Sequence, residues 1–158
     1  LEFLMEGKKL PINLEGFAVF HCGPIVKKEH GTWRIIAAGP TTSTRMESYE
    51  AELIKALGIR VVIGKGGMGQ KTTEAMKDFG AVYGAFTGGT AVLAAKLIKM
   101  VKGVEWLDLG MAEALWVLEV ENFGPLIVAI DSHGNNLYSK IIEQAEKNKD
   151  KIYHKMGV

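Results

Sequence analysis

A row of four hydroxyl side chains followed by an arginine is the segment of this sequence best suited to chemistry. Residues 41–44, Thr-Thr-Ser-Thr, precede Arg45 in the stretch GPTTSTRMESYE. Hydroxyl groups and a guanidinium both donate hydrogen bonds to oxygen anions, and a guanidinium can hold a carboxylate through two parallel bonds. Thr44 and Glu47 have the spacing of a helix capping box, which needs only one hydroxyl. The surplus of donors predicts a site for a carboxylate or a phosphate.

A second cation, Lys65, lies in the glycine-rich stretch GKGGMG at residues 64–69. This stretch matches the G-x-G-x-x-G pattern of dinucleotide-binding folds, but the next predicted strand ends without the acidic residue that would hold a ribose. It also misses the P-loop pattern, because Gln70 stands before the lysine and threonine that follow. We therefore disfavour nucleotide binding. From this loop alone, a solvated lysine in a tight turn is the simpler interpretation.

Other residues with chemical potential have simpler structural explanations. The segment Asp131–Asn136 contains His133, yet a polar turn with an asparagine helix cap explains it better than acid–base chemistry. Cys22 is the only cysteine, so it can form no internal disulfide, and one thiolate cannot hold a metal cluster. We expect it to be a small buried side chain. The remaining histidines lack a partner at ligand spacing and are interpreted as structural or solvent-facing: His21, His30 and His154.

The elements that must position these residues are apolar strands alternating with helices. Strands are predicted at residues 17–22, 32–38, 59–63, 81–86, 104–109, 116–120 and 126–130. Helices are predicted at residues 45–57, 70–79, 90 to about 101, and from 136 onward, with a charged tail at 139–158. This alternation predicts an α/β fold in layers, with a sheet that is at least partly parallel.

The two cations follow two successive predicted strands. Arg45 comes after the strand at 32–38, and Lys65 comes after the strand at 59–63, with a single helix between them. Ligands of open α/β sheets bind beyond the carboxyl ends of the strands. If the two strands are parallel neighbours, Arg45 and Lys65 face the same crevice. Two cations, several hydroxyls and a helix N-terminus would then converge on a small anion, and a dicarboxylate suits that geometry.

Length and composition exclude several classes of protein. The 158 residues fit one domain, 1–158, which is 47% hydrophobic and 23% charged with a net charge of +1. The basic residues are scattered, which argues against nucleic-acid binding. No apolar run approaches the roughly 20 residues of a membrane span, and the N-terminal segment lacks the pattern of a signal peptide. We therefore expect a cytoplasmic protein without nucleic-acid or membrane partners.

Five segments in their order along the chain resemble the β subunit of class I fumarate hydratases. They are GPTTSTRMESY, IGKGG, GAVYGAFTGGTAVLAA, VEWLDLGMAEALWVLEVENF and PLIVAIDSHGNNLY, within roughly residues 10–138. The same region forms the C-terminal domain of single-chain enzymes and is shared with L(+)-tartrate dehydratase β subunits. The resemblance implies a swivelling β/β/α fold and the reversible hydration of fumarate to L-malate, a reaction of the tricarboxylic acid cycle.

The resemblance also implies partners and residue roles. An oxygen-sensitive four-iron four-sulfur cluster would be ligated by cysteines of an α subunit, not by this chain, and one iron would act as a Lewis acid. Thr41 matches the threonine proposed as the base at the substrate carbon, helped by an acidic residue of that subunit. Arg45 matches the arginine that clamps a substrate carboxylate, and Lys65 matches the lysine of the second loop. Thr42 and Ser43 complete the predicted substrate-binding set, in a larger heteromer whose isolated chain is expected to be inactive.

The sequence also departs from the family pattern and leaves alternatives open. A G-R-D-A-A-H segment, whose arginine also contacts substrate, is usual upstream of the Leu-Pro-Ile at residues 10–12 and is absent, so the N-terminal segment is expected to be incomplete. Glu47 stands where aspartate is common. The alternatives are a dehydratase for tartrate or another hydroxydiacid, a non-catalytic anion- or nucleotide-binding module, and an assembly partner that does not touch substrate.

Overall fold

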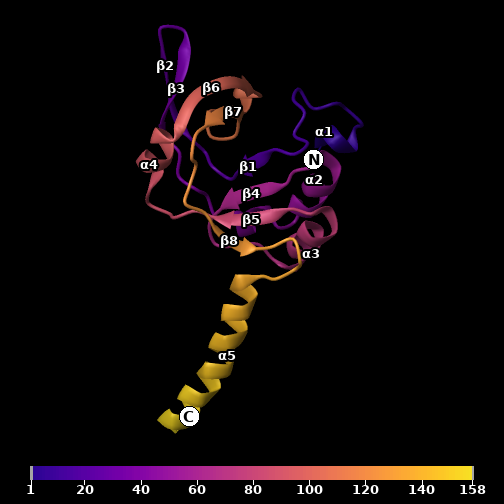
Figure 1. Cartoon of the computed structure of the whole chain (residues 1–158), viewed down its shortest axis with the longest axis vertical. Coiled ribbons are helices and arrows are strands. Elements are labelled where there is room, and N and C mark those ends of the chain that lie inside the picture. Colours follow the sequence, from indigo (N-terminus) through magenta and orange to yellow (C-terminus); the bar gives the residue numbers. More distant parts are fainter. Residues whose placement is uncertain (1, 158) are drawn as a thin grey trace.

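The computed structural model describes residues 2–157 and has a central sheet, two β-hairpins and a long C-terminal helix that projects from the body (Figure 1). The elements in chain order are α1 (Glu2–Met5), β1 (Ala18–Phe20), β2 (Ile25–Glu29), β3 (Thr32–Ala37), η1 (Ser43–Met46, a 3-10 turn), α2 (Glu50–Leu57), β4 (Val61–Gly64), α3 (Gln70–Phe79), β5 (Val82–Ala85), α4 (Ala91–Lys96), β6 (Ile98–Glu105), η2 (Leu107–Leu109), β7 (Leu115–Val120), β8 (Ile127–Ile130) and α5 (Leu137–Met156).

The central sheet has the strand order β1-β4-β5-β8. Strands β1, β4 and β5 are parallel, and β8 is antiparallel to β5. The hairpins β2–β3 and β6–β7 form two separate antiparallel pairs. The prediction of an α/β fold with a partly parallel sheet is therefore confirmed. The carboxyl ends of the three parallel strands lie at one edge of the sheet, which is the edge expected to bind ligands.

The two faces of the sheet pack against different layers. Val62 belongs to a core cluster with Ile54 of α2 and Met76 of α3, whereas its neighbour Ile63 packs with Ile35 of the hairpin β2–β3. Successive strand residues point to opposite faces of a sheet, so these two contacts define a three-layer arrangement. Helices α2 and α3 form one outer layer. The hairpins and α4 form the other, which accounts for the β/β/α layering that the family resemblance implies.

The start of the helix expected after Arg45 differs from the prediction. Residues Ser43–Met46 form a 3-10 turn, and α2 begins only at Glu50. The expected capping box does not form, because the Glu47 carboxylate instead accepts hydrogen bonds from Gly69 and Thr72 at the start of α3. A carboxylate at a helix N-terminus satisfies free N–H groups equally well when it comes from a distant segment.

Two other segments differ from the sequence interpretation. The helix expected to reach residue 101 ends at Lys96, and β6 begins at Ile98 because this segment pairs with β7. Strand β2 was not predicted, and it pairs with β3 in a hairpin. Consequently β3 is not a neighbour of β4, and the premise of two adjacent parallel strands carrying Arg45 and Lys65 is wrong.

The C-terminal segment forms a helix, as predicted, and α5 extends over Leu137–Met156. Asn136 is its N-cap, and the side-chain oxygen accepts hydrogen bonds from the N–H groups of Tyr138 and Ser139. Among residues 2–157, no helix combines the length and apolar character that crossing a membrane requires.

Candidate functional site

The segment that follows β3 inserts between the ends of β1 and β4. The N–H of Thr41 donates to the carbonyl oxygen of His21 at 2.7 Å, just beyond β1. Thr42 and Lys65 form a parallel bridge, in which the N–H of Ser43 donates to the Lys65 carbonyl at 2.8 Å and the N–H of Lys65 donates to the Thr41 carbonyl at 3.3 Å. The hydroxyl row and the glycine-rich loop therefore lie side by side at the sheet edge.

An open pocket of about 610 Å³ lies at this meeting point, and we call it the strand-end pocket. Thr41, Thr42, Arg45 and Lys65 all line it. The remaining lining residues are Phe20, His21, Cys22, Gly23, Gly39, Pro40, Met46, Tyr49, Ala112, Glu113 and Ala114. Arg45 and Lys65 thus share one crevice, as the sequence predicts. The bridge between residues 42 and 65 brings them together, rather than the pairing of β3 with β4.

The cations of the strand-end pocket have no anionic partner in the described part of the chain. Neither Arg45 nor Lys65 forms an ion pair there, and the guanidinium donates a 3.4 Å hydrogen bond from Nη2 to Thr41 Oγ1. Burial, with the charge of Glu50, raises the pKa of Tyr49, so its hydroxyl stays a hydrogen-bond donor at neutral pH. The pocket therefore offers charge and donors to a bound anion.

Ser43 is the predicted site residue that the structure separates from the others. It is fully buried and does not line the pocket. Its Oγ lies 2.9 Å from His21 Nδ1 and accepts a hydrogen bond from the Tyr83 hydroxyl at 3.0 Å. A Cβ at Gly64 would lie 1.9 Å from this oxygen, so only glycine fits there. The prediction that Ser43 contacts substrate has no support in this placement.

Ser43, His21 and Glu50 have the order of a hydrolase triad, because the Nε2 atom of His21 lies 3.2 Å from Glu50 Oε2. All three residues are buried, and Ser43 has no exposed surface for a substrate to reach. The arrangement is therefore not a nucleophile site. Sequence reasoning interpreted His21 as structural and missed its carboxylate partner, because the two residues are 29 positions apart and no local spacing connects them.

The glycine-rich loop is occupied by the protein itself rather than shaped for a phosphate. A Cβ at Gly67 would lie 2.5 Å from the ring of Tyr138 at the start of α5. The N-terminus of α3 already accommodates the Glu47 carboxylate, which accepts hydrogen bonds from Gly69 N–H at 2.6 Å and from Thr72 N–H at 3.2 Å. Both contacts explain why this loop is rich in glycine without a bound nucleotide. They therefore weaken the alternative of a nucleotide-binding module.

The polar segment before α5 is the turn that the sequence predicts. The Asp131 carboxylate accepts hydrogen bonds from the N–H groups of His133 and Asn135, both at 2.9 Å. The side-chain amide of Asn135 also donates to Asp131 Oδ2 at 2.8 Å, and this bond, followed by the backbone bonds, holds the pKa of Asp131 below its usual value. His133 does not line the strand-end pocket.

Metal ligation was tested on the donor groups of this chain. Cys22 lines the pocket, and burial raises the pKa of its thiol to about 11. Among the residues that the structure describes, no three or more His, Cys, Asp and Glu side chains gather as a possible metal site. Iron–sulfur clusters take cysteine thiolates as ligands, so the donor set described here does not fit a four-iron four-sulfur cluster.

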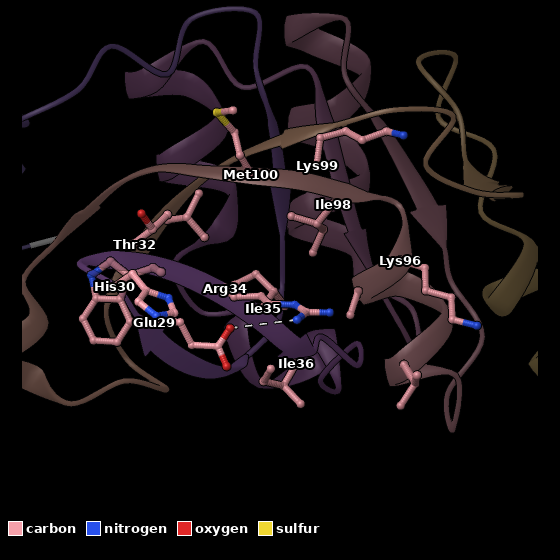
Figure 2. Close-up of a pocket in the computed structure, with 14 residues that line it drawn as sticks. Glu29, His30, Thr32, Arg34, Ile35, Ile36, Lys96, Ile98, Lys99 and Met100 are labelled. Atoms are coloured by element: carbon pink, nitrogen blue, oxygen red, sulfur yellow. Dashed lines mark ion pairs between the residues drawn. The ribbon is translucent and has the colours of Figure 1, made fainter.

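A second and larger hollow of about 710 Å³ lies between β3, α4 and β6, and we call it the hairpin hollow (Figure 2). It is lined by Glu29, His30, Thr32, Trp33, Arg34, Ile35, Ile36, Val92, Ala95, Lys96, Ile98, Lys99, Met100 and Val101. Arg34 lies 4.0 Å from Glu29, and Lys99 pairs with Glu121 at 2.5 Å. Two of its three Lys and Arg side chains thus lie within ion-pair distance of an acidic residue.

Comparison with known proteins places the chain in a family. The family described as fumarase C-terminus matches residues 1–141. An L(+)-tartrate dehydratase subunit beta from Escherichia coli (strain K12) is 47% identical over 150 residues, which are 94% of this chain and 75% of the relative. A putative L(+)-tartrate dehydratase subunit beta from Methanocaldococcus jannaschii is 46% identical over 158 residues, 99% of this chain and 77% of the relative.

A third relative is a much longer protein. A putative fumarate hydratase class I from Geobacillus stearothermophilus is 45% identical over 157 residues, which are 96% of this chain but only 30% of that protein. Nearly the whole of this chain therefore resembles both separate beta subunits and one portion of a longer polypeptide. On the match of the family over residues 1–141, this chain belongs to the fumarase C-terminus family.

Proposed function

We propose that this chain is the β subunit of a heteromeric hydro-lyase that acts on a four-carbon dicarboxylate. The observation that carries the proposal is the convergence of Arg45 and Lys65, both without an anionic partner in the described residues, on one pocket with Thr41 and Thr42. The names of the relatives, tartrate dehydratase subunits and a putative fumarate hydratase, support the reaction class.

In this proposal the two cations bind the two ends of the substrate. Arg45 holds one carboxylate through its planar guanidinium, which matches the two oxygens of a carboxylate. Lys65 attracts the other carboxylate as a point charge. Thr42 donates a hydrogen bond from the floor of the pocket. Ser43, which is buried, supports the floor from beneath instead of contacting substrate.

Thr41 is proposed to move the proton at the substrate carbon. A threonine hydroxyl is a weak base at its ordinary pKa and needs activation. The hydrogen bond from Arg45 Nη2 to Thr41 Oγ1 places a positive charge where it stabilises the deprotonated oxygen. An acidic residue from the partner subunit would accept the proton. Thr41 therefore functions only in the assembled enzyme, and the isolated chain is inactive.

The proposed partner is an α subunit that holds a four-iron four-sulfur cluster. The described residues of this chain supply binding, orientation and proton transfer, and they offer no ligand set for the cluster. We also place the complex in the cytoplasm, where a single unpaired cysteine is ordinary.

Fumarate, with L-malate as its hydrated product, is the first candidate substrate pair. L-tartrate is the second, because two of the relatives above are named as tartrate dehydratase subunits. Both acids carry two carboxylates on a four-carbon chain, so the same cations would bind either one.

The test is an anaerobic purification of the tagged chain with its bound partner from native extract. Loss of fumarate absorbance and formation of oxaloacetate from tartrate are then measured on the same preparation. Turnover of either acid by a complex that contains iron and sulfide supports the hydro-lyase and identifies its substrate. An iron-containing complex that turns over neither acid refutes it. Anion binding by the isolated chain that persists in an Arg45→Ala variant would favour a non-catalytic binding module.

A further inference from the structure

We infer that a buried chain of hydrogen bonds, from Tyr83 through Ser43 and His21 to Glu50, fixes the floor of the strand-end pocket. In this inference His21 and Glu50 are positioning residues for the segment that carries Thr41. It rests on the proposed function for its catalytic consequence, but its structural claim concerns this chain alone.

The hydrogen bonds of this network run in one direction. Burial raises the pKa of Tyr83, so its hydroxyl remains protonated and donates to Ser43 Oγ at 3.0 Å. Ser43 keeps its own hydrogen, which points to His21 Nδ1 at 2.9 Å. With Nδ1 accepting from Ser43, Nε2 is the ring nitrogen that donates to Glu50 Oε2, at 3.2 Å. This tautomer is assigned from the partners of each nitrogen.

His21 holds the pocket segment at two points. Its carbonyl oxygen accepts the N–H of Thr41 at 2.7 Å, and its ring contacts the Ser43 hydroxyl two residues later. Ser43 in turn donates its N–H to the carbonyl of Lys65. The main chain of His21 therefore holds Thr41, and its ring holds the side chain of Ser43, whose own main chain is bonded to Lys65. Rotation of that ring would release the Ser43 side chain while leaving both strands intact.

Glu50 has no other evident reason to be buried. Its side chain is 2% exposed, and Oε1 has no hydrogen-bond partner among the described residues. A buried carboxylate oxygen without a partner reduces stability, since it loses its hydration without replacement. The described bond of this carboxylate is the one to His21. Because burial of Glu50 lowers stability while its carboxylate orients the His21 ring, Glu50 fits a positioning role better than a stabilising one.

The expected consequence concerns kcat more than KM. Displacement of a reacting group by about 1 Å can lower a rate about a hundredfold. The side chains of Arg45 and Lys65 form no hydrogen bond to the network among the described residues, so its loss is expected to displace Thr41 with less effect on substrate binding.

The experiment compares four variants in the assembled complex. Ser43→Ala removes one hydroxyl, Glu50→Leu removes the acceptor for His21, and Glu50→Gln keeps an acceptor oxygen in the same position. Thr73→Val is the matched control, because it removes another buried hydroxyl, which bonds the Gly69 carbonyl and the Asn136 side chain away from the pocket segment. Hydrogen exchange of residues 39–46 reports the order of the segment, and kcat and KM are measured for the acid that the wild type turns over.

Faster exchange of residues 39–46 and a kcat at least about tenfold lower are expected for Ser43→Ala and Glu50→Leu. Near-wild-type values are expected for Glu50→Gln and Thr73→Val. Unchanged exchange in Ser43→Ala overturns the inference, as does an equal increase in Thr73→Val, which would indicate general destabilisation. If Glu50→Leu does not assemble, hydrogen exchange and kcat of Ser43→Ala alone test the inference. If the wild-type complex is inert toward both acids, the proposed function fails, and exchange alone still tests the network.

Discussion

The strand-end pocket is smaller than the hairpin hollow, yet it is the one in which no Lys or Arg side chain has an ion-pair partner among the described residues. The hairpin hollow is the larger, at about 710 Å³ against about 610 Å³. Among its basic side chains, Arg34 lies within ion-pair distance of Glu29, marked by a dashed line in Figure 2, and Lys99 pairs with Glu121. In the strand-end pocket, Arg45 and Lys65 have no ion-pair partner among the described residues.

The difference shows that cavity volume is a weak guide to function in this chain. An anion gains most from charges that are close together, unneutralised and supported by fixed hydrogen-bond donors. In the strand-end pocket, Arg45 and Lys65 line one cavity without an ion-pair partner among the described residues, and main-chain hydrogen bonds join Thr41, Ser43 and Lys65 at the ends of two parallel strands. The hairpin hollow is formed by side chains of a hairpin, a short helix and a strand of another hairpin.

Loss of one arginine from each region should separate them most clearly. In the assembled enzyme, Arg45→Ala should lower kcat/KM about a hundredfold, because a charged hydrogen-bonding group that binds a carboxylate contributes roughly 2–3 kcal/mol. Arg34→Ala, in the hairpin hollow, should change kcat/KM less than twofold. Steady-state kinetics on the purified complex measures both. Equal losses would contradict the assignment of substrate to the strand-end pocket.

The reactivity of Cys22 reports on the strand-end pocket alone, because it is the only cysteine. Burial raises its pKa from 9.0 to about 11, so the reactive thiolate at pH 7.5 should be about a hundredfold scarcer than for an unperturbed thiol. Alkylation by iodoacetamide, followed by mass spectrometry, should be slow and should accelerate up to about pH 11. The urea-unfolded chain is the control. Equal rates in folded and unfolded protein would show that the thiol is not buried.

Replacing one lysine in each region, Lys65 or Lys96, should give the same contrast as the arginine variants with smaller effects. Lys65→Met should raise KM about tenfold with a smaller change in kcat, since it removes a point charge that binds substrate and transition state alike. Lys96→Met, in the hairpin hollow, should leave both constants unchanged. A fall in kcat without a change in KM for Lys65→Met would instead assign the lysine a role in the chemical step.

Two glycines compare the packing around the buried Ser43 side chain with the packing of β6. Gly64→Ala should lower the melting temperature by several degrees, because its Cβ would lie 1.9 Å from Ser43 Oγ and overpacking costs about 1–3 kcal/mol. Gly103→Ala in β6 should have little effect, since its nearest neighbour is the Val117 side chain at 4.0 Å. Differential scanning fluorimetry measures both variants. A neutral Gly64→Ala would show that Ser43 can leave its buried position.

The elements predicted best from sequence are those that local signals define. Helix α3 has the predicted bounds, Gln70–Phe79, because a helical pattern ends at Gly80, which adopts the left-handed conformation. Strand β6 was predicted partly as helix, since its pairing with β7 is a tertiary contact. Strand β2 was missed although Gly31 is a sequence signal for a tight turn, and in the structure His30 and Gly31 both have positive φ, as in a two-residue hairpin turn.

The residues of the site also fall into two groups, those that local sequence signals reveal and those that only the tertiary structure brings together. Arg45 and Lys65 could be brought together from sequence, because each follows a strand in an α/β pattern. The expectation that the strands before Arg45 and Lys65 are parallel neighbours was nevertheless wrong, since β3 pairs with β2 and not with β4. The network of His21, Ser43 and Glu50 has no sequence signature, because its members come from a strand end, a 3-10 turn and a helix. Only the fold brings these segments into contact.

The Glu47 carboxylate ties the two pocket loops together a second time. Ser43 joins the loop after β4 at its beginning, through Lys65, and Glu47 joins it at its end, through Gly69 and Thr72. The loops at residues 39–50 and 64–72 are thus fastened at both ends and form one modular unit. In a chimera that takes only one loop from a relative, the side chain at position 47 and the α3 N-terminus that it contacts would come from different proteins. Transfer of a relative's substrate preference into this scaffold therefore requires the two loops to be grafted as a pair.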